Sequence, residues 1–242
     1  MSQLQQSSVR NKLLRALTPE DFKSLAPHLE PIRLDLRALL FETGQVIPHV
    51  VFPERGNASF LANTEEGRFE VGVVGPEGVI GVPVVLGIDT SPHTAMVQGA
   101  GEGLSLAPEI LRSALDGSPS LRSVLLRYVH VFLTQISETA HANAGFPIEA
   151  RLARWVLMSH DRVGQDELPL THEFLSMMLG TRRPGVTLAV QNLEGSRLIK
   201  ATRGRIRVLD REGLQLLAGD AYGLAEAEYE RAFTTPLRSG AA

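Results

Sequence analysis

The distribution of glycine divides this chain of 242 residues into two parts. From Ile32 to about Leu106, glycine recurs every few residues and separates short β-branched and aromatic runs such as Val50-Val51-Phe52. Short apolar runs between regular turn signals are typical of a β-sandwich or a β-barrel. We therefore expect a domain of short strands in this part of the chain, with a short helical segment before it.

Glycine is absent from residues 118–144, where apolar residues recur three or four positions apart. This spacing predicts one long amphipathic helix, about 40 Å in length at 1.5 Å per residue. Such a helix is longer than a small β-domain needs as a cover, so we expect part of its apolar stripe to contact a second copy of the chain. The residues of this predicted dimer stripe are Leu121, Leu125, Tyr128, Phe132 and Ile136. The alternative is a helix that packs entirely on its own domain.

After a helix break at Gly145-Phe146-Pro147, the chain has the pattern helix, helix, turn, helix, hairpin. Thr171 suits the N-cap of a short helix that stops at Gly180. Pro184 suits the first position of a second helix, which we expect to end near Glu194. A hairpin with a basic tip follows. Two short helices, a glycine turn and a basic hairpin are the pattern of a winged helix-turn-helix.

The charge of the chain is unevenly distributed, although its net value is only −3 at pH 7. From Arg182 to Arg211 there are eight basic residues, and the acidic ones are Glu194 and Asp210. A single exposed arginine is ordinarily a solvated side chain. Eight basic residues on a turn, a helix and a hairpin tip instead indicate a surface that binds DNA.

These C-terminal residues resemble the Crp/Fnr superfamily of bacterial transcription regulators. The resemblance is strongest over residues 175–194 and continues into Leu198-Ile199 and the hairpin. Residues 41–45 and 51–56 are similar to strands of the family's cyclic-nucleotide-binding-like domain. The resemblance implies an α+β fold with three segments: a jelly-roll β-barrel that senses an effector at 1–117, a dimerisation helix and hinge at 118–146, and a winged helix-turn-helix at 147–242.

The resemblance also implies a homodimer that binds a palindromic operator in double-stranded DNA, with RNA polymerase as a further partner. The second helix of the motif would enter the major groove, where Arg183 would contact guanine and Arg182 would contact phosphate. Pro184 and Leu188 stand where the best-known members of the family carry Glu and Arg. We therefore expect an operator that differs from theirs.

Three residues of the second helix, Val186, Val190 and Leu193, should pack into the domain, which turns the opposite face toward DNA. The candidate DNA-binding residues are Thr171, Arg182, Arg183, Gly185, Thr187, Leu188, Gln191, Arg203 and Arg205.

Residues 75–95 occupy the place of the family's phosphate-binding cassette, in which cyclic-AMP binders carry a glutamate and an arginine. This chain has Gly81-Val82-Pro83 and His93-Thr94 there, so both charged ligands are absent. A neutral histidine cannot make the bidentate contact of an arginine with phosphate. We therefore predict no cofactor and an unidentified, less polar effector in place of cyclic AMP; the alternative is haem bound through His93. The candidate effector-pocket residues are Gly81, Val82, Pro83, His93, Thr94, Leu133, Ile136 and Ser137.

Other classes of protein are excluded by what the sequence lacks. The absence of cysteine excludes disulfides, thiolate zinc sites and cysteine nucleophiles. Because no metal-binding spacing and no catalytic motif occurs, we predict neither a metal site nor an enzyme. The apolar runs are too short to span a bilayer and no secretory signal is present, so we expect a cytoplasmic protein without membrane contact.

Two functions remain after these exclusions. The first is a sequence-specific, DNA-binding transcription regulator of the Crp/Fnr type. The alternative is a small-molecule-binding or architectural protein whose helix-turn-helix mediates protein contacts.

Overall fold

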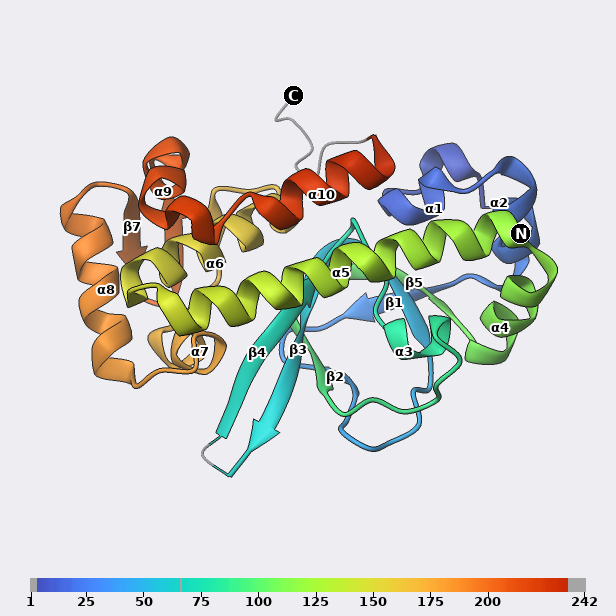
Figure 1. Ribbon diagram of the computed structural model, residues 1–242, viewed down its shortest axis with the longest axis horizontal. Helices are drawn as coiled ribbons and strands as arrows, with labels where there is room; N and C mark the ends of the chain where they lie inside the picture. The colour runs from blue at the N-terminus through green and yellow to red at the C-terminus, as the bar shows by residue number, and fades with distance from the viewer. Residues whose placement is uncertain (1–3, 66, 235–242) are drawn as a thin grey trace. The chain divides into compact units, whose positions relative to one another are not determined.

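The computed structural model describes residues 4–65 and 67–234 of the chain (Figure 1). Contacts within the chain divide it into two compact units, each of which is described by itself below. Residues 1–61 and 73–132 belong to the first unit, and residues 62–72 and 133–242 belong to the second. The three functional segments expected from the sequence are not tested by this division and stay a prediction.

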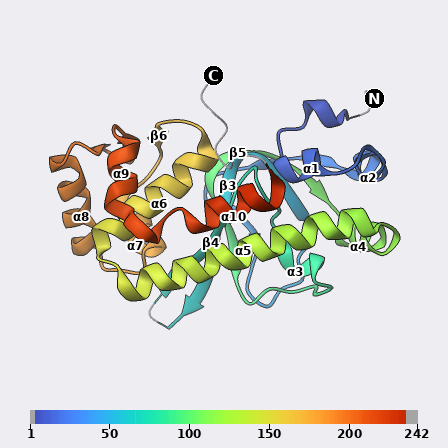
Figure 2. The same cartoon turned by 45° about the horizontal axis from the view of Figure 1, so that its top comes forward.

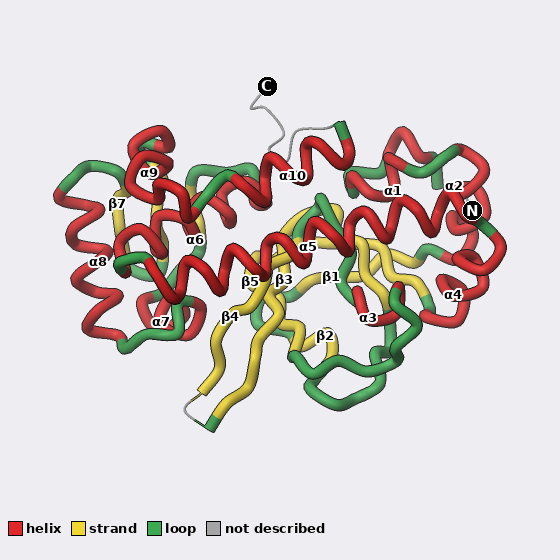
Figure 3. The backbone as a smooth tube through the Cα atoms, in the orientation of Figure 1, coloured by secondary structure: helices red, strands yellow, loops and turns green. Residues whose placement is uncertain are grey.

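The first unit is built on a sheet whose central member is the long strand β5 (Figure 3). Strands β1, β2 and β3 each pair with β5 in the antiparallel direction, and β4 lies beside β3. The bounds of these strands are β1 (Glu30–Leu34), β2 (Leu39–Phe41), β3 (Val50–Thr64), β4 (Gly67–Val74) and β5 (Thr94–Leu106). The expected domain of strands is confirmed, whereas its closure into a barrel is not.

Glycines in the sheet allow β3 and β5 to approach each other closely where the register of the pair shifts. A Cβ added to Gly101 would lie 2.2 Å from the backbone oxygen of Arg55. A Cβ added to Gly56, whose φ is +77°, would lie 2.2 Å from the backbone oxygen of Gly99. Neither position has room for a side chain, which explains part of the glycine spacing in the sequence.

The helices of the first unit are α1 (Lys12–Ala16), α2 (Pro19–Leu25), α3 (Val82–Val85), α4 (Pro108–Gly117) and the N-terminal half of α5 (Pro119–Gly145). The long helix α5 has nearly the predicted bounds. Its N-cap region is held by Asp21 of α2, whose carboxylate accepts hydrogen bonds from the hydroxyls of Ser118 and Ser120. Burial, the largest single cause, acts to raise the pKa of Asp21, but these two hydrogen bonds and one from Thr18 together lower it.

The predicted dimer stripe on α5 requires a correction. Leu121, Leu125, Tyr128 and Phe132 are each at most 5% exposed within a single chain. The ring of Phe132 lies 5.1 Å from that of Phe60 in β3. These four side chains therefore form the core of one unit, and the predicted contact with a second copy through them is wrong. The most apolar stripe of an amphipathic helix covers the nearest apolar surface, which here is the chain's own sheet.

The second unit contains the remainder of α5 and a three-stranded sheet surrounded by helices. Its elements are α6 (Ile148–Val163), β6 (Glu167–Leu168), α7 (His172–Met178), α8 (Arg183–Gly195), β7 (Ile199–Thr202), β8 (Arg205–Val208), α9 (Arg211–Ala218) and α10 (Leu224–Phe233). The strand order is β6-β8-β7. Helix α6 is almost entirely buried, with α8 and α9 packed against it (Figure 2). None of the helices in the described ranges combines the length and the apolar character that a bilayer crossing requires.

Residues 62–72, from the ends of β3 and β4, also belong to the second unit. The indole Nε1–H of Trp155 in α6 donates a hydrogen bond of 2.9 Å to the Glu70 carboxylate, and both side chains are buried. Phe69 lies against Gly180, because a Cβ added to this glycine would be 3.4 Å from the Cβ of Phe69. Phe69 of β4 thus packs on the segment that follows α7.

Gly78 offers a test of the packing of α5 on the sheet. A Cβ added there would lie 2.0 Å from the hydroxyl oxygen of the buried Tyr128. We expect Gly78→Ala to lower the free energy of unfolding by about 1–3 kcal/mol, because overpacking forces neighbouring atoms to move. Equilibrium unfolding in urea measures the change. The control is Gly117→Ala in α4, where an added Cβ meets nothing within 4 Å. Equal stability of the two variants would contradict the described packing.

Candidate DNA-binding site

The turn between α7 and α8 is formed as the sequence predicts, with a small shift at its end. The hydroxyl of Thr171 accepts a hydrogen bond of 3.2 Å from the backbone N–H of Phe174, so Thr171 is the N-cap of α7. Gly180 follows α7 with φ +55°, a conformation that glycine adopts without strain. Arg182 is the N-cap of α8, and the helix begins at Arg183, one residue earlier than expected.

Helix α8 has one face buried in the domain and the opposite face exposed. Val186, Ala189, Val190 and Leu193 are at most 1% exposed, which confirms the predicted inward face. The residues that face outward are the exposed Arg182, Arg183, Pro184, Leu188 and Gln191 and the half-buried Gly185 and Thr187. The predicted orientation of α8 is therefore confirmed, and the roles of these residues at DNA stay predictions.

The hairpin of β7 and β8 turns at Arg203 and Gly204, where Gly204 has φ +76°. It is joined to α8 by the carboxylate of Glu194, which accepts a hydrogen bond of 2.8 Å from the backbone N–H of Ala201. Glu194, one of the two acidic residues in the basic segment, therefore holds the hairpin in place. We call residues 199–208 the wing.

The two candidate arginines of the wing have different surroundings. Arg205 forms an ion pair with Glu167 of β6, a short strand that the sequence analysis did not foresee. Arg207 lies 3.4 Å from the same carboxylate. These arginines lower the pKa of Glu167, chiefly through the hydrogen bond from Arg205. Within the described residues Arg203 has no such partner, so its charge is available to a ligand.

A groove of about 610 Å³ lies between the start of α7, the outward face of α8 and the wing. It brings together five of the predicted residues, which are Thr171, Arg183, Gln191, Arg203 and Arg205. His172 and Glu173 also line it, and the sequence analysis did not name them. Their position directly after the N-cap of α7 could have identified them from the sequence. His172 Nδ1 lies 3.1 Å from the hydroxyl of Thr187 and so connects α7 to α8.

The candidate effector residues belong to two different units. In the first unit, Gly81 with φ +110° precedes α3, Val82 is buried, and Pro83 is half-buried. Burial lowers the pKa of His93, which favours a neutral imidazole. Thr94 is buried, and its hydroxyl lies 3.2 Å from that of Thr43.

The other three candidates, Leu133, Ile136 and Ser137, lie in the second unit, and their place in a pocket stays a prediction. In the described part of the chain, no group of three His, Cys, Asp or Glu residues is arranged to hold a metal ion.

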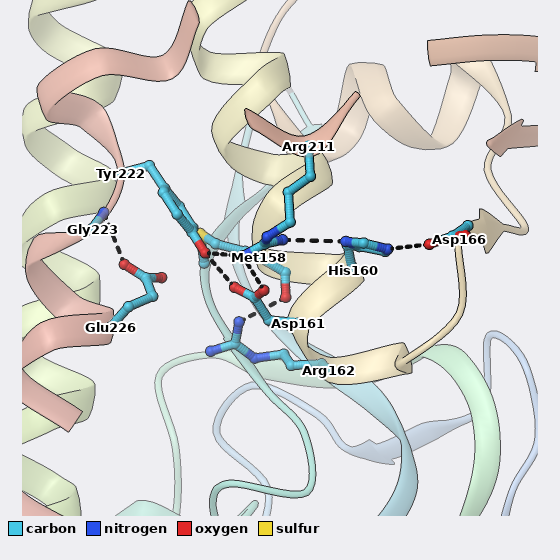
Figure 4. A network of polar contacts seen from close by, with 9 residues as sticks. All are labelled: Met158, His160, Asp161, Arg162, Asp166, Arg211, Tyr222, Gly223 and Glu226. Carbon is cyan, nitrogen blue, oxygen red and sulfur yellow. Dashed lines mark hydrogen bonds and ion pairs between the residues drawn. The ribbon is translucent and has the colours of Figure 1, made fainter. Parts of the chain in front are cut away.

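A buried network of charged groups, absent from the sequence analysis, joins α6 to α9 and to the segment before α10 (Figure 4). Arg211 of α9 pairs with Asp161 of α6 at 2.7 Å, and the hydroxyl of Tyr222 donates a 2.6 Å hydrogen bond to the same carboxylate. Burial, reinforced by Asp161, raises the pKa of Tyr222. Arg211 also donates to His160 Nδ1 at 3.2 Å. Since Nδ1 accepts, the proton lies on Nε2, which donates to Asp166 at 2.8 Å.

Two further arginines of α6, Arg154 and Arg162, bring positive charge near Glu226 of α10. Arg154 is buried and donates a hydrogen bond of 3.0 Å to the hydroxyl of Thr139. Glu226 of α10 has an enclosed carboxylate, which accepts a hydrogen bond of 3.0 Å from the backbone N–H of Gly223. Burial raises the pKa of Glu226, and the nearby Arg162 and Arg154 oppose this effect.

A model of a known domain family matches the segment that carries this site. It is described as the Crp-like helix-turn-helix domain, and it matches residues 150–217, from α6 to α9. Residues 150–217 form a Crp-like helix-turn-helix domain. No curated protein matches the sequence.

Solved structures show that the likeness extends over most of the chain. A Crp/Fnr-family regulator from Eubacterium rectale has a TM-score of 0.68 at 16% identity, with 85% of this chain and 97% of that chain covered. A Crp-family regulator from Thermus thermophilus has a TM-score of 0.66 at 18% identity, with 79% and 98% covered. The c-di-GMP-responsive global regulator of Xanthomonas campestris has a TM-score of 0.62 at 15% identity, with 79% and 99% covered.

The matched domain distinguishes the two functions that the sequence left open. The chain carries a Crp-like helix-turn-helix domain and is a DNA-binding transcription regulator. The alternative of a helix-turn-helix that serves only protein contacts is therefore set aside. Within the matched domain, α8 is the second helix of the helix-turn-helix, and α10 lies beyond the domain.

The enclosed carboxylate of Glu226 predicts a pH dependence of stability. A carboxyl whose pKa is raised on folding keeps its proton up to a higher pH in the folded state than in the unfolded state. Its contribution to stability therefore falls as pH rises from the ordinary value of 4.5 through the raised pKa. We expect Glu226→Gln, which keeps a neutral acceptor for Gly223, to become progressively more stable than the wild type over that range.

Urea unfolding at a series of pH values measures this difference. The control is Glu230→Gln at an exposed position of α10, which should keep the wild-type dependence. If Glu226→Gln and the wild type lose stability in parallel as pH rises, the carboxylate is not enclosed as described.

Proposed function

We propose that the regulator binds a palindromic operator as a homodimer, with α8 in the major groove and the wing on the phosphate backbone. The observation that carries this proposal is the groove between α8 and the wing, which places Arg183 and Arg203 on its lining. A helix presented beside a basic hairpin matches the dimensions and the charge of duplex DNA. Acting on DNA, the regulator would work in the cytoplasm, without enzymatic activity, and with RNA polymerase as a partner.

Arg183 and Arg203 differ in what they can contact. Arg183 is exposed at the first residue of α8, which is the end of the helix that approaches base edges. A guanidinium there can donate two hydrogen bonds to O6 and N7 of guanine. Arg203 stands at the turn of the wing, and Arg182 at the N-cap of α8, where backbone phosphates are the nearer groups. Base choice should therefore depend on Arg183.

The face of α5 that is suited to contact a second copy of the chain differs from the one first predicted. Leu126 and Leu133 are 44% and 57% exposed, and Ala140 is exposed seven residues further on. The half-buried Ile136 lies between Leu133 and Ala140. It is the one residue that this face shares with the predicted dimer stripe. A seven-residue repeat of apolar positions keeps one face of a helix against a partner helix. We infer that two α5 helices pair along this seam.

The effector of the first unit is proposed to be something other than cyclic AMP. Phe41 and Phe60 have ring centroids 6.0 Å apart, and both are paired in register with Ala95, next to the cassette residues His93 and Thr94. Aromatic side chains of the chain itself thus occupy the sheet beside the cassette. The stretch from Gly72 to Leu106 contains no lysine or arginine that could pair with a phosphate. A less polar effector agrees better with these surroundings.

The roles of the arginines are tested by two substitutions. Arg183→Ala should weaken binding to the preferred operator by about 1–3 kcal/mol and relax base choice at one position of each half-site. Arg203→Ala should weaken all sequences alike and lower the slope of log K against log salt by about one, because phosphate contacts release counterions. Fluorescence anisotropy over a series of salt concentrations measures both effects.

Glu167→Gln is the matched control at the wing, because it removes the carboxylate that occupies Arg205 and Arg207. It should strengthen binding to every duplex and steepen the salt dependence. A sequence-selective effect of Arg203→Ala, together with a uniform effect of Arg183→Ala, would reverse the assignment of roles.

The dimer seam is tested by the double substitution of Leu126 and Leu133 by lysine. Two buried, unpaired charges at the seam should convert the dimer to a monomer at micromolar concentration and abolish tight binding to the full palindrome. Half-sites should be about ten base pairs apart, one turn of DNA. Sedimentation velocity measures the mass, with Leu216→Lys on α9, 84% exposed, as the control. A variant that remains dimeric would exclude this seam.

The exclusion of cyclic AMP is tested by calorimetric titration. A cyclic phosphate without a fixed positive partner loses several kcal/mol of solvation, on the order of magnitude of a typical binding free energy. We expect no saturable heat with cyclic AMP or cyclic GMP at low micromolar concentration. Saturable binding that also tightens operator binding would contradict the proposal.

A further inference from the structure

The polar groups on the outward face of α8 are unevenly available to DNA. The hydroxyl of Thr187 donates 3.0 Å to the backbone oxygen of Arg183 and lies 3.1 Å from His172 Nδ1. The side-chain amide of Asn192 donates 2.9 Å to the carboxylate of Glu149 in α6. Two of the polar side chains on or near this face are thus already engaged within the domain.

The middle of the same face offers only apolar surface. Leu188 is 58% exposed, although the two residues that follow it, Ala189 and Val190, are buried. Pro184 is exposed one turn earlier, so the two side chains are neighbours on the helix. Proline has no N–H, and leucine has no polar atom. Arg183 lies before this apolar pair and Gln191 after it, where each can hold the helix to base edges.

Duplex DNA presents one apolar group on the base edges of its major groove, which is the C5 methyl of thymine. We propose that Leu188, beside Pro184, recognises thymine methyl groups and thereby makes α8 selective for thymine at the centre of each half-site. The inference rests on the proposed function, because it requires that α8 enters the major groove.

An exposed leucine is common on protein surfaces and needs no function by itself. The distinguishing feature of Leu188 is its position. It stands on the second helix of a Crp-like helix-turn-helix domain, between two side chains that can hydrogen-bond to bases. Leu216 of α9 is more exposed, at 84%, but lies on another helix, so it serves as a matched control.

The test uses the full chain and an operator selected from a random duplex library. Each thymine of the half-site is replaced in turn by deoxyuridine, which keeps every hydrogen-bonding group and lacks only the methyl group. For the wild type we expect about a fourfold loss of affinity at one or two thymines of each half-site, the factor that corresponds to about 0.8 kcal/mol per buried methyl group. Leu188→Ala should bind the thymine and deoxyuridine operators equally, and Leu216→Ala should keep the fourfold difference.

Three results would overturn the inference while leaving the proposed function intact. They are a selected half-site without thymine, equal wild-type affinity for thymine and deoxyuridine at every position, and an unchanged fourfold difference in Leu188→Ala. Failure of the library to enrich any sequence would instead contradict the proposed function, and the inference with it. Because Leu188 is exposed, Leu188→Ala should unfold at the same urea concentration as the wild type, which separates a contact with DNA from a loss of folding.

Discussion

The burial of one stripe of α8 determines what this regulator can present to DNA. Val186, Ala189, Val190 and Leu193 lie in the core of the domain, against the almost fully buried helix α6. Burial of three or four such side chains contributes several kcal/mol, roughly 1.5–3 kcal/mol for each valine or leucine. Rotation of the helix would expose them, so the opposite face is fixed. The positions of Arg183, Leu188 and Gln191 are consequences of that packing.

The second unit, to which α8 belongs, buries more charged side chains than the first unit does. Arg211, Asp161 and Tyr222 connect α6 to α9 and to the segment before α10, and Arg154 connects α6 to α5. Buried charges are expensive to desolvate, but their hydrogen bonds have strict directions, so the helices they join have few alternative arrangements. The apolar stripe thus sets the rotation of α8, and the network joins α6, on which α8 packs, to α9.

Local sequence patterns predicted α7, α8 and the wing because caps, glycine turns and short apolar stripes act within a few residues. Thr171 and Gly180 have the roles that their chemistry indicates. The apolar stripe of α5 was assigned to the wrong partner, because periodicity shows that a face is buried and cannot show by what. The pairing of Glu70 with Trp155 and the network of Asp161 join residues far apart in sequence. No local pattern marks such charges as buried.

The proposed function requires that the outward face of α8 and the wing contact DNA directly. A photoreactive amino acid placed at Gln191 or at Arg203, both on the lining of the groove, tests this contact, with the exposed Leu216 of α9 as the comparison. Irradiation of each variant bound to its selected operator should give covalent protein–DNA products from positions 191 and 203 and none from 216. Products from position 216, or their absence at 191 and 203 while the operator is bound, would contradict the account.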